Sequence, residues 1–184
     1  MTLSVQQRGE TLATLRFVQV RLMESCARWV PTTPEMEVKL LFGAHVWDLA
    51  QHADALGKRV HELRMPLQHS LPPQEDYIAA LDELTGAGET SQKLAALYEA
   101  ILPSLGKRYR SYVVRTDALM DAPSVRIIER ILADQSRMIR EYKELISALP
   151  GLQPADPMVA RMRDRESSVD DIVVHRPSSR GTSK

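Results

Sequence analysis

Two histidines and an aspartate lie on one predicted helix at spacings that suit proton transfer. His45, Asp48 and His52 follow one another at intervals of three and four residues, which is the spacing of a single α-helical face. An unperturbed histidine titrates at about pH 6.5, so it can accept and release protons under neutral conditions. The pattern predicts general acid/base chemistry, in which His45 or His52 moves the proton and Asp48 orients one of them.

Five further polar side chains interrupt the apolar faces of the other predicted helices. Inside a bundle, an unpaired polar group is costly, so its presence at such positions suggests a polar layer in the lumen. We expect Arg108 to hold a carboxylate or an enolate-like oxygen of a ligand, and Tyr112 to donate a hydrogen bond to it. Tyr98, Gln19 and Gln135 complete the predicted substrate-binding set.

A purely structural role is the alternative interpretation of the polar residues on these helix faces. Gln19 and Gln135 could hydrogen-bond across the core and fix the register of the helices. Each histidine could be a core residue whose hydrogen bonds are satisfied, and Arg108 could extend its charge to the rim. Tyr98 and Tyr112 could be packing residues. The sequence leaves the functional and the structural interpretation open.

Four long amphipathic segments would position these side chains, because apolar residues recur in them at spacings of three and four. These segments cover residues 10–30, 35–63, 90–119 and 124–149. Pro103 should kink or divide the third segment, whose apolar stripe ends at Leu119. Residues 65–73 form a proline-rich connection before a short helix at 76–84. The pattern predicts an all-α four-helix bundle, and its long second connection permits a crossover.

Charged residues of the fourth segment lie away from the centre of its apolar face. We expect a solvated surface formed by Arg126, Glu129, Arg130, Arg137, Arg140 and Glu141. A di-metal carboxylate bundle needs Glu-x-x-His on two helices, and here Leu49 stands three residues before His52. A mononuclear site made of His45, Asp48 and His52 is a geometric alternative. The interpretation that we favour has no bound metal and no cofactor.

The charge balance, the cysteine content and the lack of long apolar runs exclude several classes of function. Lys+Arg and Asp+Glu are 24 each, so the formal net charge is zero, which argues against a nucleic-acid partner. The single cysteine, Cys26, excludes an internal disulfide and a cysteine-based zinc site. The first ten residues lack the apolar core of a signal peptide, and no apolar run reaches the roughly 20 residues that span a bilayer. We therefore expect a cytoplasmic protein with no membrane partner.

A change in composition near residue 150 divides the chain. We assign residues 1–150 to the bundle and 151–184 to a largely disordered tail, because Pro150 stops a helix and the residues after 161 are mostly Arg, Asp, Ser and Gly. Disorder is expected from residue 163 onward. Residues 172–174, Ile-Val-Val, could dock on a partner, although we favour the interpretation that they are incidental.

Two stretches resemble the ferritin-like superfamily and, within it, bacterial ferritin-like proteins of uncertain function. They are residues 41–56, LFGAHVWDLAQHADAL, and residues 116–134, TDALMDAPSVRIIERILAD. The resemblance implies a four-helix bundle and, in metal-binding relatives, iron storage, di-iron oxidation or hydroxylation. Only His52 matches a ligand position. The expected acidic residues and histidine are replaced at Gln19, Gln135 and Met138, so the implied di-metal site is degenerate.

Together these features predict a metal-independent bundle that binds a small organic molecule. As an enzyme, it would use acid/base chemistry to isomerise, cyclise or eliminate from a biosynthetic intermediate. One alternative is a metal-dependent oxidoreductase, with a di-metal site or with His45, Asp48 and His52 as ligands. Another is a non-catalytic subunit that forms a homodimer and supports a partner. An exposed apolar stripe on the second or fourth helix would mark that alternative.

Overall fold

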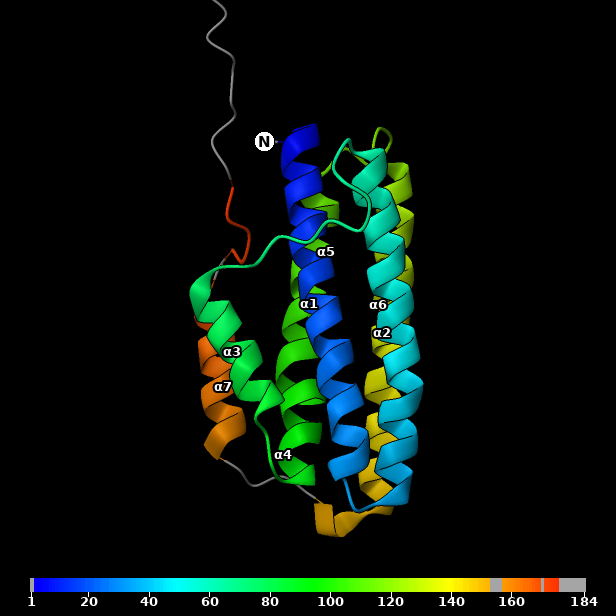
Figure 1. Ribbon diagram of the computed structural model, residues 1–184, viewed down its shortest axis with the longest axis vertical. Coiled ribbons are helices and arrows are strands. Elements are labelled where there is room, and N and C mark those ends of the chain that lie inside the picture. The colour runs from blue at the N-terminus through cyan, green and yellow to red at the C-terminus, as the bar shows by residue number, and fades with distance from the viewer. Residues whose placement is uncertain (1, 153–156, 170, 176–184) are drawn as a thin grey trace, which may run out of the picture.

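Helices are the regular secondary structure of the described part of the chain, which contains no strand. A computed structural model describes residues 2–152, 157–169 and 171–175 (Figure 1). Its elements are α1 (Val5–Thr32), α2 (Met36–Glu62), α3 (Glu75–Thr85), α4 (Thr90–Ala95), the π-helix η1 (Ala96–Ile101), α5 (Leu102–Arg115), α6 (Ala122–Ala148), the 3-10 turn η2 (Pro150–Leu152) and α7 (Pro157–Ser168). The prediction of an all-α fold is confirmed.

Four long helical segments lie side by side along the long axis of the molecule (Figure 1). Helix α1 runs away from the end that holds the N-terminus, and α2 returns antiparallel to it. The connection through α3 then travels back along the bundle, so the continuous segment α4–η1–α5 rises parallel to α2. Helix α6 descends in contact with both α2 and α5. The expected crossover is therefore present in the second connection.

Predicted apolar stripes form the core where the helices face each other. Every residue of the apolar stripe predicted for α1 is buried: Leu12, Leu15, Gln19, Leu22, Cys26 and Trp29. The stripe predicted for α2 is buried from its first residue to Val60: Val38, Phe42, His45, Leu49, His52, Leu56 and Val60. A capping box at Ser4, in which its hydroxyl accepts from the Gln7 amide, begins α1 at Val5 rather than near Glu10. None of the helices in the described part of the chain is long and apolar enough to cross a bilayer.

The third segment departs from a regular α-helix just before Pro103. A proline lacks the backbone N–H and clashes with the carbonyl four residues earlier, which here belongs to Glu99. The wider π turn at Ala96–Ile101 precedes this position and carries both Tyr98 and Glu99, so the expected disruption takes the form of a π turn. Helix α5, the last part of this segment, ends at Arg115. Leu119, which was predicted to be the last residue of the apolar stripe, lies in the following turn and is 85% exposed.

The expectation of disorder from residue 163 needs correction. Residues 163–168 belong to α7, which packs against α3 and η1. Figure 1 shows α7 beside α3. After it, Ile172 and Val173 are buried, and the Gln74 amide donates to the Ile172 carbonyl at 3.0 Å. These apolar side chains cover the outer side of the bundle, so they are not incidental. Residues 176–184 lie outside the described residues.

Candidate functional site

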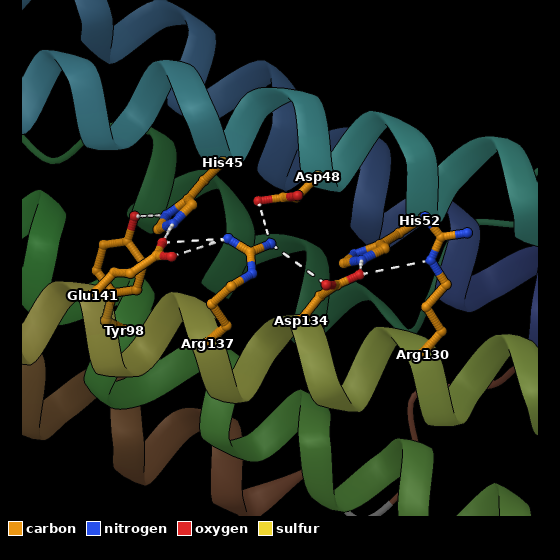
Figure 2. A network of polar contacts seen from close by, with 8 residues as sticks. All are labelled: His45, Asp48, His52, Tyr98, Arg130, Asp134, Arg137 and Glu141. Atoms are coloured by element: carbon orange, nitrogen blue, oxygen red, sulfur yellow. Dashed lines mark hydrogen bonds and ion pairs between the residues drawn. The ribbon is translucent and has the colours of Figure 1, made fainter.

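The predicted catalytic residues of α2 face a matching set on α6. His45, Asp48 and His52 project toward Asp134, Arg137 and Glu141, which have similar spacing (Figure 2). Because the helices are antiparallel, His45 lies opposite Glu141, His52 lies opposite Asp134, and the Asp48–Arg137 pair lies between them. We call these six residues the α2–α6 cluster.

His45 is a fully buried imidazole with both nitrogens occupied. Its Nε2 lies 2.8 Å from Glu141 Oε2, and its Nδ1 lies 2.6 Å from the Tyr98 hydroxyl. Burial lowers the pKa of His45, although Glu141 opposes that shift. Burial also holds the pKa of Tyr98 well above its usual range, so this hydroxyl keeps its proton. A neutral imidazole satisfies both contacts when Tyr98 donates to Nδ1 and Nε2 donates to Glu141.

His52 differs from His45 because one of its ring nitrogens has no protein partner. Its Nε2 lies 3.0 Å from Asp134 Oδ2, whereas its buried Nδ1 has no hydrogen bond within the described residues. Burial lowers the pKa of His52, again against the opposing effect of Asp134. The neutral ring that donates from Nε2 to Asp134 therefore keeps a lone pair on Nδ1, which is the requirement for a proton acceptor.

Arg137 provides the positive charge at the centre of the cluster. One terminal nitrogen lies 2.9 Å from Asp48 and 3.4 Å from Asp134, and the other lies 3.2 Å from Glu141. The hydrogen bond to Asp48 is the largest effect that raises the pKa of Arg137. The guanidinium thus contacts three carboxylates at once, and its single positive charge offsets part of their combined negative charge. Asp48 was expected to orient a histidine, but its ion pair is with Arg137, and Asp134 and Glu141 orient the imidazoles instead.

The cluster does not fit a metal centre. Within the described residues, no group of three or more His, Cys, Asp or Glu side chains is placed to hold a metal ion. The three α2 residues proposed as mononuclear ligands each contact a different α6 residue rather than a common point. A cation placed among the three carboxylates would also have to displace the guanidinium of Arg137, which lies within 3.4 Å of each of them.

A cavity of about 160 Å³ adjoins His52. Its walls are His52, the apolar residues Ala55, Ile127 and Ile131, and the polar side chains of Gln51, Arg126 and Arg130. Cavities of about 150 Å³ hold a benzene-sized molecule, so this space suits a ligand of few atoms. We call it the His52 cavity.

Gln19 and Gln135 lie elsewhere in the core. The Gln19 amide donates to the Tyr109 hydroxyl at 2.6 Å and so joins α1 to α5 across the core, as the structural interpretation expects. Gln135 is buried close to Gly106 of α5, where its Oε1 would lie 3.4 Å from a Cβ atom on that glycine. Its Nε2 has no hydrogen bond within the described part of the chain. No described contact joins either glutamine to a histidine.

Arg108 and Tyr112 also lie apart from the histidines. Arg108 of α5 donates to the carbonyl of Val169 at 2.7 Å and forms an ion pair with Glu166 of α7 at 3.2 Å. These contacts connect α7 to α5. The Tyr112 hydroxyl donates at 2.6 Å to the buried carboxylate of Asp121, which lies just before α6. Both side chains line a separate cavity of about 150 Å³ that Ile172 and Val173 help to enclose. The structure thus brings Tyr98 to His45, but it does not gather all eight predicted site residues in one lumen.

Sequence reasoning missed the partners that α6 supplies. Arg137 and Glu141 were expected on a solvated face, yet each is only about one third exposed (33%) and is turned toward α2. Asp134, which pairs with His52, was not among the predicted site residues. A signal was present, because Asp134, Arg137 and Glu141 repeat the three- and four-residue spacing of the α2 set with complementary charges.

The chain matches no family model, no curated protein and no solved structure. No relative therefore assigns a role to these side chains, and function has to follow from their contacts. Two observations restrict the possible function most. The imidazole of His52, whose Nδ1 has no partner within the described residues, lines a small cavity, and Arg137 pairs with Asp48 and Asp134 beside it.

Proposed function

We propose that this chain is a ferritin-like helical bundle that binds a small organic anion in the His52 cavity and transfers a proton with His52, without a metal. The observation that carries the proposal is the state of His52. Its Nε2 is held by Asp134, its Nδ1 has no partner within the described residues, and the ring lines a cavity. A histidine oriented by a carboxylate is the usual arrangement of a general base.

The walls of the cavity indicate the kind of ligand. Ala55, Ile127 and Ile131 favour an apolar body. Arg126 and Arg130 add positive charge to the same walls, although Arg130 also pairs with Asp134 at 4.0 Å. Guanidinium groups bind carboxylates with directional hydrogen bonds. The cavity volume of about 160 Å³ restricts the ligand to a small molecule. A small carboxylate that carries a carbonyl or a double bond fits these requirements.

The chemistry follows from the position of the base. Nδ1 of His52 takes a proton from a carbon next to a carbonyl, and the electron pair moves onto the carbonyl oxygen as an enolate. The charge of Arg126 or Arg130 stabilises that oxygen, and Asp134 stabilises the imidazolium through Nε2. Return of the proton to another carbon gives an isomer. Loss of a leaving group gives elimination, and attack of the enolate on a second carbon closes a ring.

Two observations support the ferritin-like assignment and the absence of a metal. The long helices have one crossover connection, which is the topology of ferritin-like bundles. The guanidinium of Arg137 occupies the place among Asp48, Asp134 and Glu141 where a metal ion would have to lie. In this proposal, therefore, the chain has the helix topology of ferritin-like bundles, and His52 transfers a proton where metal-binding bundles use a metal ion.

Exchange of carbon-bound hydrogen in D₂O tests the proposal even while the product of the reaction is unidentified. We expect the protein to catalyse exchange next to the carbonyl of at least one small 2-oxo or unsaturated carboxylate, observed by proton NMR. His52→Gln should lower that rate at least about 100-fold, the usual contribution of a general base. His61→Gln changes an exposed histidine on the same helix and should leave the rate unchanged. Equal rates in the folded His52→Gln and natural proteins would refute the role of His52.

A non-catalytic homodimer is the second candidate, because α2 exposes the apolar stripe that would mark it. Met36, Leu40 and Trp47 are each more than 60% exposed, and their spacing places them on one side of α2. Light scattering after size exclusion tests this candidate. A dimer that Trp47→Glu converts to a monomer supports it, and a monomer in the natural protein rejects it.

A further inference from the structure

A third and larger cavity lies between α6, η1, α5 and α7. Its volume is about 550 Å³, within the range of about 300–1,000 Å³ that is usual for ligand sites. Pro103, Ile139 and Ile146 supply apolar wall, and the stacked rings of Tyr98 and Tyr142, 4.9 Å apart, also line it. We call it the Tyr98 cavity.

The charged side chains of this cavity leave one positive charge in excess. Glu99 accepts from the Tyr142 hydroxyl at 2.5 Å and from Arg163 at 2.7 Å, so its charge is already balanced within the protein. Lys143 lines the same cavity and makes no ion pair with any residue in the described part of the chain. An ammonium group beside apolar wall favours a ligand that carries a single negative charge at one end.

We propose that the Tyr98 cavity binds a monocarboxylate with an elongated apolar body, of the kind represented by a medium-chain fatty acid. Ile139 and Ile146 are seven residues apart on α6, so this wall extends for about 10 Å. The carboxylate pairs with Lys143, and the acyl chain lies along Ile139, Ile146 and Pro103. The proposal is independent of proton transfer at His52.

The cavity also contacts the α2–α6 cluster through Tyr98. The ring of Tyr98 forms part of the cavity wall, and its hydroxyl is bound to Nδ1 of His45. The ring lies on the π turn, the segment whose backbone departs from the α-helix. A bound acyl chain therefore changes the surroundings of Tyr98 and Tyr142, and their ring resonances report occupancy of this cavity.

Octanoate is the probe for this site, and octan-1-ol is its uncharged match. We expect isothermal titration calorimetry to show one octanoate bound per chain, with octan-1-ol at least tenfold weaker because it lacks the charge that pairs with Lys143. Lys143→Gln should weaken octanoate binding about tenfold, and Lys143→Arg should restore it. Equal affinity for both probes, or no binding of octanoate, would overturn the proposal.

Two serines of α6 provide a matched pair of blocking variants. Ser147 lines the cavity and Ser136 does not, yet both are exposed and both donate to the carbonyl four residues earlier at 2.8 Å. Ser147→Trp should abolish octanoate binding and the accompanying shifts of the Tyr98 and Tyr142 resonances, whereas Ser136→Trp should preserve both. His52→Gln should also leave octanoate binding unchanged. Binding that survives Ser147→Trp would place octanoate elsewhere and refute this site.

Discussion

Removal of Arg137 should destabilise the bundle and should do so most strongly at high pH. Arg137→Met keeps the length of the side chain but leaves Asp48, Asp134 and Glu141 without their shared cation. The three ion pairs are partly exposed, so each contributes about 0.5–1 kcal/mol rather than the full value of a buried pair. Their loss should lower the free energy of unfolding by about 2 kcal/mol, or Tm by roughly 4–8 °C.

Chemical denaturation with urea measures this loss, and Arg140→Met is the matched control. Arg140 lies one turn along the same helix, is 64% exposed and reaches only Glu144, at 3.9 Å. Its replacement should cost no more than about 0.5 kcal/mol. A loss for Arg137→Met no larger than that of the control would show that the ion pairs of Arg137 do not stabilise the bundle.

The pH dependence gives a second test of the same variant. Arg137 is one of the charges that lower the pKa of His45, so its removal raises that pKa. On acidification the imidazole then takes up a proton and replaces part of the lost positive charge. The stability gap between Arg137→Met and the natural protein should therefore be smaller at about pH 5.5 than at about pH 8. A gap that is independent of pH would contradict this mechanism.

Three further predictions concern parts of the fold outside the central ion pairs. Glu166→Gln leaves Arg108 without its buried partner and should lower the free energy of unfolding by about 3 kcal/mol, which urea denaturation measures. Cys26 is buried, and burial raises its pKa to about 12, so iodoacetamide should alkylate it only after unfolding, as mass spectrometry would show. Burial lowers the pKa of both His45 and His52, so the unfolded chain binds more protons below its ordinary histidine pKa of about 6.5. Stability should therefore fall as pH decreases from about 6.5 toward the lowered folded values, and a stability that rises on acidification would refute the neutral state of these rings.

The long helices could be predicted because their buried residues recur at the three- and four-residue spacing of an α-helix. In α2 the residues from Val38 to Val60 at three- and four-residue spacing are buried, as the sequence predicted. The segment from Pro157 to Ser168 was missed for the opposite reason. Its described side chains are mostly charged, and it is held by polar contacts such as that between Arg108 and Glu166 rather than by a regular apolar stripe. Composition alone cannot distinguish such a helix from a disordered tail.

Half of the site could be predicted, because it lies on a single helix. His45, Asp48 and His52 share a face whatever their neighbours are, whereas the pairing of His52 with Asp134 depends on which helix packs against α2 and in which register. A charged residue on the flank of an apolar stripe looks the same whether it faces water or another helix. Arg108 was misplaced for a related reason, because its partner Glu166 lies in the helix that the sequence did not predict.

The protonation state of His52 tests the central proposal most directly. Nitrogen-15 NMR of the histidine rings distinguishes the neutral from the charged form and one tautomer from the other. We expect His52 to be neutral at pH 7, with the proton on Nε2 facing Asp134, a free lone pair on Nδ1 and a pKa below its ordinary value. A charged ring at pH 7, or a neutral ring with its proton on Nδ1, would remove the proton acceptor from the cavity and contradict the proposed function.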